Sequence, residues 1–194
     1  LRLFTDSSKT NQVASDVLVT VLDTSTAPLT DDYTATTSTN GFVTVGGSAT
    51  GSIEIAGDQD WFAVSLTAGN IYHIDLEGSP TSAGSLADPY LRGLYNSNGT
   101  LISGTTDDDS GTSRNAQLAF TATTTGTHYI AAGAYNSSYY DNIGTYRVSV
   151  TQTGRADDYT DTTSTSGLVT VGGFTTGNIE IAGDQDWFAV SLTA

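Results

Sequence analysis

Residues 53–68 read IEIAGDQDWFAVSLTA, and residues 179–194 repeat the same sixteen letters. Around this stretch, residues 31–68 and 157–194 match at 32 of 38 positions, so the two copies are offset by 126 residues. In each copy an aspartate-rich turn runs into a strand with alternating apolar residues, which are Phe62, Val64 and Leu66 in the first copy. The repeat therefore predicts one type of domain that is used more than once.

The repeat divides the chain into three parts. We expect residues 31–156 to form a complete module, because a unit of about 126 residues can bury a core of its own. Residues 157–194 correspond to the N-terminal part of a second copy, truncated before the module is complete. Residues 1–30 resemble the C-terminal strands of a preceding β-sandwich domain, of the cadherin-like or immunoglobulin-like kind, followed by a linker. We therefore expect the chain to belong to a longer, tandemly repeated protein.

The composition is that of an all-β protein. Charged residues make up only 14% of the chain, which contains no cysteine. Threonine, valine, isoleucine and tyrosine favour strands, whereas glycine, aspartate and asparagine favour turns. About nine short strands with turns between them predict a two-sheet sandwich. They are expected at 42–45, 52–55, 60–66, 72–76, 90–95, 101–103, 117–121, 128–134 and 145–150.

The charge of the chain excludes some partners and suggests one cofactor. The net charge is −15, from 21 acidic and six basic residues, and 18 of the acidic residues are aspartate. Nucleic acid is therefore not expected as a partner, because a phosphate backbone requires lysine and arginine. No apolar run is long enough to insert into a membrane. Most of the carboxylates lack an internal cation, so they either face water or bind inorganic cations.

Several segments together resemble a known family. They are GDQDWFAVSLTAGNIYHIDLEG (57–78), LADPYLRGLYNSNGTLIS (86–103), DDDSG (107–111), QLAFTATTTGTHYIAAGAY (117–135) and GTYRVSV (144–150). In this order they resemble the bacterial pre-peptidase C-terminal domain, and the resemblance extends from Asp31 to about Thr153. It implies a jelly-roll-like β-sandwich without catalytic activity. Such domains occur, often in tandem, on secreted proteases and on large bacterial surface proteins, and several of them bind calcium.

The resemblance also implies where calcium would bind. In the collagenase-type members the ligands come from an acidic segment before the first strand and from the turn that leads into the strand resembling Asp-Trp-Phe. The matching residues of the first copy are Asp31, Asp32, Asp58 and Asp60, and those of the second copy are Asp157, Asp158, Asp184 and Asp186. The first segment is Asp-Asp-Tyr here, whereas the collagenases have a version rich in glutamate and asparagine.

The spacing Asp58-x-Asp60 has two interpretations. In an extended backbone the two carboxylates would point the same way, about 7 Å apart. Two anions this close repel each other unless a cation lies between them, and calcium requires six to eight oxygen ligands. Alternatively, Asp58 is only a turn-forming residue after Gly57.

The run Asp107-Asp108-Asp109 is the densest charge in the chain. If its loop lies at the same end of the sandwich as Asp88, then Asp88, Asp107 and Asp109, with Asp141, would form a second calcium site. The alternative is a solvated acidic loop, which is the usual role of a charge run. The run lacks the spacing of an EF-hand loop.

Aromatic residues suggest a candidate ligand surface. The strand pattern places Trp61 on the face opposite Phe62, where it either forms an exposed platform for sugar or peptide or packs under a loop. Tyr135, Tyr139 and Tyr140 surround small polar residues, a combination that makes adaptable contacts. Alternatively, these tyrosines shield an edge of the sandwich.

Neither histidine, His73 nor His128, lies in a recognisable catalytic motif, so we do not expect an enzyme. We expect a calcium-stabilised spacer module of a secreted or cell-surface bacterial protein, such as an adhesin or an extracellular fibre. Its partners would be neighbouring copies, other β-sandwich domains and other chains of a fibre. The alternative is an accessory module that binds a polysaccharide, a matrix protein or the substrate of a secreted hydrolase.

Overall fold

The structure, a computed structural model, describes residues 30–135 and 142–193. Residues 1–29, where strands of a preceding domain and a linker were expected, and the residues Tyr139, Tyr140 and Asp141 lie outside these ranges. Among the described residues no helix is long and apolar enough to cross a lipid bilayer.

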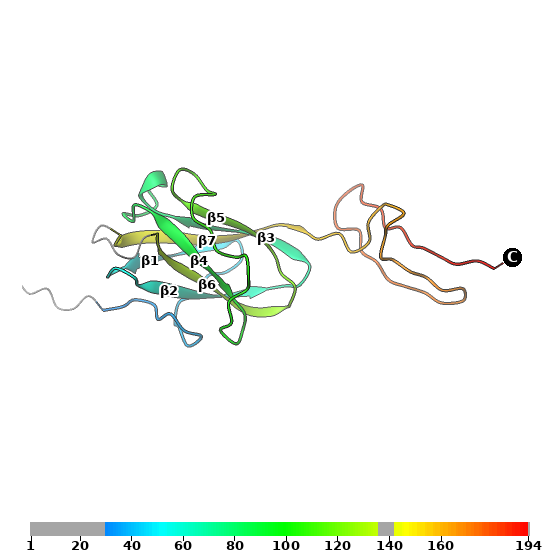
Figure 1. Cartoon of the computed structure of the whole chain (residues 1–194), viewed down its shortest axis with the longest axis horizontal. Coiled ribbons are helices and arrows are strands. Elements are labelled where there is room, and N and C mark those ends of the chain that lie inside the picture. Colours follow the sequence, from blue (N-terminus) through cyan, green and yellow to red (C-terminus); the bar gives the residue numbers. More distant parts are fainter. Residues whose placement is uncertain (1–29, 136–141, 194) are drawn as a thin grey trace, which may run out of the picture.

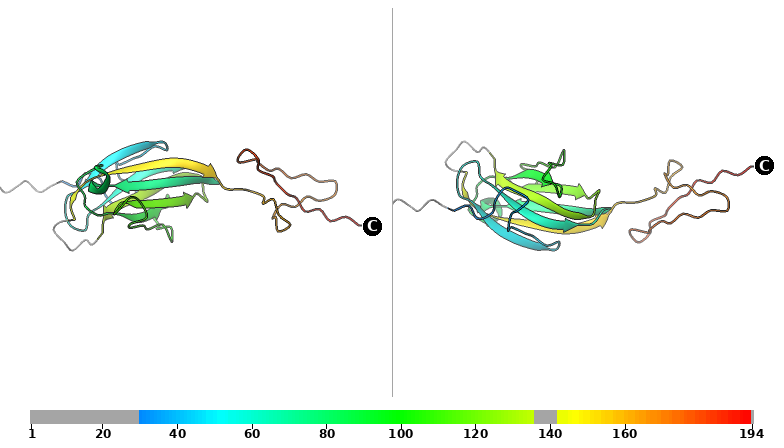
Figure 2. Two further views of the ribbon diagram at one scale, coloured as in Figure 1. Left: turned by 90° about the horizontal axis from the view of Figure 1, so that it is seen from above. Right: turned by 90° about the horizontal axis from the view of Figure 1, so that it is seen from below.

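The described part of the first module is a sandwich of two antiparallel sheets (Figure 1; Figure 2 shows the two layers). One sheet has the order β1-β7-β3-β5 and the other has the order β2-β6-β4. A single turn of 3-10 helix, Ser79–Thr81, follows β3. The strands are β1 (Gly47–Ile53), β2 (Gln59–Leu66), β3 (Asn70–Glu77), β4 (Pro89–Tyr95), β5 (Ala116–Thr121), β6 (Gly126–Ala134) and β7 (Gly144–Arg155).

The core lies between the two sheets, and alternation along each strand fills it. Phe62, Val64 and Leu66 of β2 are buried, as the sequence predicts. Tyr72, Ile74 and Leu76 of β3 are buried in the same way and face them from the other sheet, together with Tyr146, Val148 and Val150 of β7. The prediction of an all-β sandwich is therefore confirmed.

Two of the nine expected strands are not strands in the structure. Phe42 makes only an isolated parallel bridge to Ala63, and Leu101 makes only an isolated antiparallel bridge to Tyr95. The strand expected at 52–55 begins earlier, at Gly47, and ends at Ile53. Its first residues are small or polar, so their side chains do not indicate a strand, but their backbone pairs with β7 throughout.

The second copy shows how much of this fold depends on partner strands. In the first copy β1 pairs with β7 and β2 pairs with β6, and Leu66 is 1% exposed. The corresponding Leu192 is 78% exposed, and the described residues of the second copy make one isolated bridge, between Leu168 and Ala189. The same sequence therefore buries its apolar face only where strands equivalent to β6 and β7 cover it.

We expect Ile74→Ala to lower the free energy of unfolding by about 2–5 kcal/mol, because the Ile74 side chain is fully buried between the sheets. The matched substitution Ile55→Ala removes the same atoms from a side chain that is 63% exposed, and it should cost less than about 0.5 kcal/mol. Urea denaturation monitored by circular dichroism measures both values. Equal costs for the two variants would contradict the assignment of the core.

Candidate functional site

Four carboxylates converge where β1 ends and β2 begins. Asp31, Glu54, Asp58 and Asp60 each offer one oxygen, and these oxygens all lie within 4.8 Å of one another. Glu54 follows β1, and Asp60 is the second residue of β2. We call this set the β1–β2 acidic cluster.

The turn between β1 and β2 is built around the Asp58 carboxylate. Its Oδ1 accepts the Gln59 backbone N–H at 2.9 Å, and its Oδ2 accepts the Glu54 backbone N–H at 3.4 Å. The Asp58 backbone N–H donates to the Ile55 carbonyl at 3.1 Å. The turn-forming role of Asp58 and its place in the cluster are therefore compatible, because one carboxylate oxygen can accept a hydrogen bond and still bind a cation.

Asp60 is the innermost member of the cluster, with no exposed surface. Its Oδ2 accepts a short hydrogen bond from the Tyr146 hydroxyl of β7, which belongs to the opposite sheet. Its Oδ1 is buried without a partner, and so is Oε2 of Glu54. Buried carboxylate oxygens are normally paired, so these two unsatisfied acceptors leave room for a cation or for protons.

The electrostatics of the cluster agree with this geometry. Burial, together with the charges of Asp32, Asp58 and Glu54, raises the pKa of Asp60 to about 8, although the Tyr146 hydrogen bond acts in the other direction. Burial and the neighbouring Asp58 raise the pKa of Glu54 to about 7. Near neutral pH and without a cation, the cluster therefore retains protons that ordinary carboxyl groups would lose.

Asp32 lies beside the cluster. Its Oδ2 accepts the Ser52 backbone N–H at 3.1 Å. Burial, and to a lesser extent the charges of Asp31 and Asp58, raise the pKa of Asp32, while the Ser52 hydrogen bond lowers it. Of the residues expected at this site, the structure thus places Asp31, Asp58 and Asp60 within the cluster and Asp32 next to it.

Glu54 was not among the residues expected at this site. An acid four residues before Asp58 was visible, and the second copy has the same acid at Glu180. If the strand continued, alternation would place the Glu54 side chain on the exposed face. Because β1 ends at Ile53 and a turn follows, Glu54 instead lies next to Asp58.

The second copy repeats the arrangement. Asp157, Asp158, Glu180 and Asp186 offer oxygens within 4.8 Å of one another. Both Glu180 oxygens and Oδ1 of Asp186 are buried without a partner. Asp184, which was expected to be a ligand, is outside this set, but its Oδ2 accepts the Glu180 backbone N–H at 3.0 Å, as Asp58 does for Glu54.

A third set consists of Asp88, Asp108 and Asp109, whose oxygens also lie within 4.8 Å of one another. Oδ1 of Asp88 and Oδ1 of Asp108 are buried without a partner, and Arg114 contacts the other Asp88 oxygen at 3.3 Å. The structure therefore brings Asp88 and Asp109 together, as expected, but it adds Asp108 where the sequence analysis placed Asp107.

Asp107 has a different role. Its backbone bridges to Leu91 of β4, and its Oδ2 accepts the Gln117 backbone N–H at 2.8 Å and the Ser110 backbone N–H at 3.3 Å. Asp107 makes an isolated bridge, whereas the chain bends at residues 108–110, so the regular alternation of a strand does not continue beyond Asp107. Asp107 thus ties its loop to β5, and Asp108 joins the cluster.

Trp61 does not form an exposed platform. Its side chain is 8% exposed and packs on the outer face of the β2-β6-β4 sheet, with ring centroids 4.1 Å from Tyr95 and 5.8 Å from Tyr129. The loop that contains Thr37 lies against these aromatic rings, since the Tyr129 hydroxyl donates a hydrogen bond to the Thr37 carbonyl at 3.0 Å. Tyr135, by contrast, is 49% exposed.

Two other features carry no chemistry of their own. The buried His128 ring contacts neutral groups, Thr124 Oγ1 at 3.4 Å and the Gly126 carbonyl at 3.1 Å.

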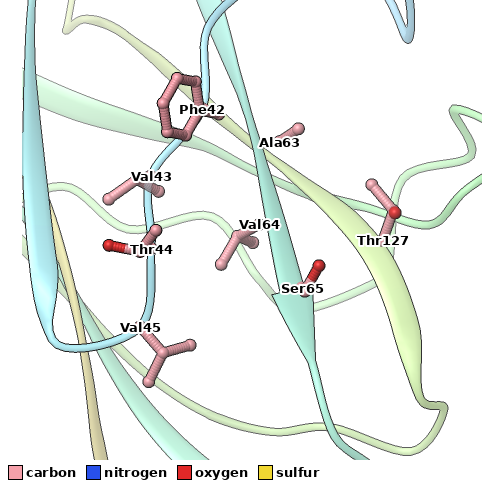
Figure 3. A pocket seen from close by; sticks show the side chains of 8 residues that line it. All are labelled: Phe42, Val43, Thr44, Val45, Ala63, Val64, Ser65 and Thr127. Atoms are coloured by element: carbon pink, nitrogen blue, oxygen red, sulfur yellow. The ribbon is translucent and has the colours of Figure 1, made fainter.

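An open groove of about 300 Å³ separates residues 42–45 from β2 (Figure 3). Apolar and hydroxyl side chains line this groove: Phe42, Val43, Thr44, Val45, Ala63, Val64, Ser65 and Thr127.

Comparison with known proteins gives one family. Residues 58–134 match the family model of the bacterial pre-peptidase C-terminal domain. No curated protein matches the chain. Among solved structures, the chain is similar to the pre-peptidase C-terminal domain of a collagenase from Bacillus anthracis, with 17% identity, a TM-score of 0.42, and coverage of 57% of this chain and 92% of that one.

The chain is also similar to PliG of Aeromonas hydrophila, a periplasmic inhibitor of g-type lysozyme. The identity is 15%, the TM-score is 0.35, and the match covers 57% of this chain and 97% of that one. Both TM-scores lie below 0.5, so the function is argued from the residues of this chain.

In buffer free of multivalent cations, we expect the melting temperature to fall as the pH rises from 5 to 8. The unfolded chain loses the Asp60 proton near pH 3.8, whereas the folded protein keeps it up to about pH 8. Between these values the folded state binds more protons, so its stability decreases as the pH increases. Asp60→Asn should reduce this slope, and Asp75→Asn, on β3 outside the cluster, should not. A melting temperature of the parent protein that is independent of pH would contradict the assignment.

Proposed function

We propose that this chain, whose residues 58–134 match the model of a non-catalytic domain found in secreted proteases, serves as a calcium-stabilised spacer of a large repetitive bacterial protein. That protein would be secreted or attached to the cell surface, as an adhesin or an extracellular fibre. The observation that carries the proposal is the buried Asp60 carboxylate, with one oxygen held by Tyr146 and the other facing the β1–β2 acidic cluster without a partner.

The donor set fits calcium. All four members of the β1–β2 acidic cluster supply carboxylate oxygens. Calcium takes six to eight oxygen ligands, including backbone carbonyls and water, whereas zinc favours nitrogen and sulfur. A divalent ion would neutralise the charges that raise the pKa values of Asp60 and Glu54, and it would satisfy their buried oxygens. Because only the folded state gathers these ligands, the ion would stabilise that state by mass action.

The path of the chain supports a linear array. Ile53 at the end of β1 pairs with Gly144 at the start of β7. The acidic cluster therefore lies at the end of the sandwich where β7 begins, and we call the two ends of the sandwich along its strands its poles. β7 pairs with the whole of β1 as far as Val150, which lies opposite Gly47, and then continues to Arg155 at the opposite pole. Figure 1 shows the chain approaching one pole near residue 30 and leaving the sandwich from the other. Modules with this path join head to tail.

The junction between the two copies is short. Arg155 is the last residue of β7, and Asp157 already belongs to the acidic set of the second copy. The one residue between them, Ala156, donates its backbone N–H to the Gly69 carbonyl of the first module at 2.6 Å. An ion bound to Asp157 and Asp158 would therefore act within two residues of the preceding sandwich and would restrict bending at the joint.

Asp88, Asp108 and Asp109 are proposed as a second calcium site. Burial raises the pKa of both Asp88 and Asp108, and in Asp108 the charge of Asp109 adds to this effect. Arg114 already offsets part of the charge at Asp88, so this site should bind calcium more weakly than the β1–β2 acidic cluster.

We expect calcium to raise the melting temperature of the chain and a chelator to lower it. Calcium at about 100 times its dissociation constant stabilises the folded state by about 2.7 kcal/mol. Terbium should bind the same site and emit light on excitation of Trp61, the residue after Asp60. The Kd should fall in the range of extracellular modules, about 10⁻⁴–10⁻³ M. A melting curve that is identical in calcium and in chelator would overturn the proposal.

Matched variants separate the two sites. Glu54→Gln should weaken the calcium-dependent stabilisation of the first module, because it replaces a carboxylate ligand of the first cluster with a neutral amide. Asp108→Asn should remove the weaker site in a calorimetric titration, whereas Asp107→Asn should leave the number of bound ions unchanged and lower only the stability of its loop. Equal loss of calcium in the Asp107 and Asp108 variants would contradict the placement of the second site.

The array geometry predicts a length. The 12 residues of β7 span the module from pole to pole, which is about 40 Å at about 3.3 Å per residue. In small-angle X-ray scattering, joining two complete copies of residues 31–156 head to tail should increase the maximum dimension by about 40 Å in calcium. Chelation should broaden the distance distribution. A compact, side-by-side pair in calcium would contradict the spacer role.

A further inference from the structure

Arg92 is held in place, yet no acid among the described residues pairs with it. Among the described residues, Arg114 pairs with Asp88 and Arg147 pairs with Glu77. Arg92 and Arg155 have no carboxylate partner within residues 30–135 and 142–193, and Arg155 is exposed at the end of β7. Arg92, by contrast, is partly buried against a sheet. In a protein of net charge −15, an immobilised cation that has no carboxylate partner in the described part of the chain requires an explanation.

A β-bulge places Arg92 on the outer face of the β2-β6-β4 sheet. Leu91 pairs with Ala132 and Gly93 pairs with Ala131, so Arg92 is the extra residue on β4. The bulge allows both Leu91 and Leu94 to point into the core, and Gly93 adopts a φ of +124° that disfavours other residues. Bulges are frequent at sheet edges next to functional sites, where they redirect a side chain.

The guanidinium group is fixed by three contacts. It lies over the Tyr90 ring, 4.7 Å from the centroid, and one Nη donates to the Ala134 carbonyl. The Arg92 side chain also packs on Gly133, so closely that a Cβ atom added to this glycine would lie 2.9 Å from the Arg92 Nε. The Nε itself is buried without a partner. The planar group is thus held in one orientation over Gly133, and because its Nε is buried, a ligand would have to bind at the Nη end of the guanidinium.

Aromatic surface continues the site. Tyr135 follows β6, its ring centroid lies 6.0 Å from that of Tyr90, and its side chain is half exposed. The Tyr135 backbone N–H donates to the Asp88 carbonyl at 3.0 Å, which anchors the start of this loop to β4. Tyr90, Arg92 and Tyr135 therefore form one partly exposed surface, which we call the Tyr–Arg surface.

We propose that the Tyr–Arg surface binds an acidic polysaccharide through one uronate carboxylate at a time. The carboxylate accepts hydrogen bonds from the Arg92 guanidinium, whose planar fork matches this anion, and the sugar rings pack on the two tyrosines. The proposal is independent of calcium binding by the β1–β2 acidic cluster.

Charge and area select this ligand over others. The negative net charge of the protein repels densely charged polyanions. At physiological ionic strength this repulsion is screened beyond about 8 Å, so a polymer with widely spaced carboxylates can still bring one of them to a single arginine. Two tyrosine rings and one guanidinium offer far less than the roughly 1,000 Å² that a stable protein interface requires. A polysaccharide with one carboxylate in every second sugar meets both conditions.

Isothermal titration of the whole chain with hyaluronan oligosaccharides at 0.15 M NaCl tests this inference, in calcium and in chelator. The parent protein should bind in both. Carboxyl-reduced oligosaccharides of the same length, and the variant Arg92→Gln, should each bind about tenfold more weakly, which corresponds to the loss of one charge-assisted bond. Arg147→Gln makes the same charge change on β7 and should bind within about twofold of the parent, since Arg147 pairs with Glu77 on the other sheet.

The circular dichroism spectrum and melting temperature show whether Arg92→Gln is folded. If it is not, Tyr135→Ala, which truncates a half-exposed side chain, replaces it and should show the same loss. The inference is overturned if the parent does not bind, if the carboxyl-reduced sugar binds equally well, or if the folded variant binds like the parent. Equal binding of a short polyglutamate peptide would overturn the choice of a saccharide.

Discussion

The buried carboxylate of Asp60 is the constraint on which the rest of the module depends. It lies on β2, in one sheet, and accepts a hydrogen bond from Tyr146 on β7, in the other sheet. A fully buried acid with one unsatisfied oxygen is unfavourable unless it is protonated or shared with a cation. The packing of the two sheets and the electrostatics of the pole are therefore coupled through one side chain, so that a cation at the pole would also stabilise the core.

This coupling gives the repeat a physical meaning. The letters shared by both copies contain the turn, the acids Glu54, Asp58 and Asp60, and the core strand β2. β7 ends at Arg155, and a single residue separates it from Asp157 of the next acidic set. The proposed spacer role draws on this short connection together with the repeated acids.

The sequence anticipated much of the candidate site, but not all of it. Asp31, Asp58 and Asp60 were expected together, because the resemblance to the pre-peptidase C-terminal domain implies ligands at these positions and the spacing Asp58-x-Asp60 suits a cation. Glu54 and Asp108 were not included, since their participation depends on how the backbone turns after Ile53 and on which way side chains point opposite β4. Similarly, the strand pattern placed Trp61 opposite Phe62, but only the packing of Tyr95, Tyr129 and the neighbouring loop showed that its ring is covered.

By itself the sequence determined the β-sandwich class and the inward face of strands such as β2 and β3, because residue alternation and turn residues act locally. The tertiary structure alone decided which carboxylates meet, that Asp60 is bound by Tyr146, and that a bulge presents Arg92 beside two tyrosines. These contacts join residues far apart in the chain, and register, bulges and burial set them. Leu66 and Leu192 share the same local sequence, yet Leu66, on a strand paired with β6, is buried, whereas Leu192 is exposed.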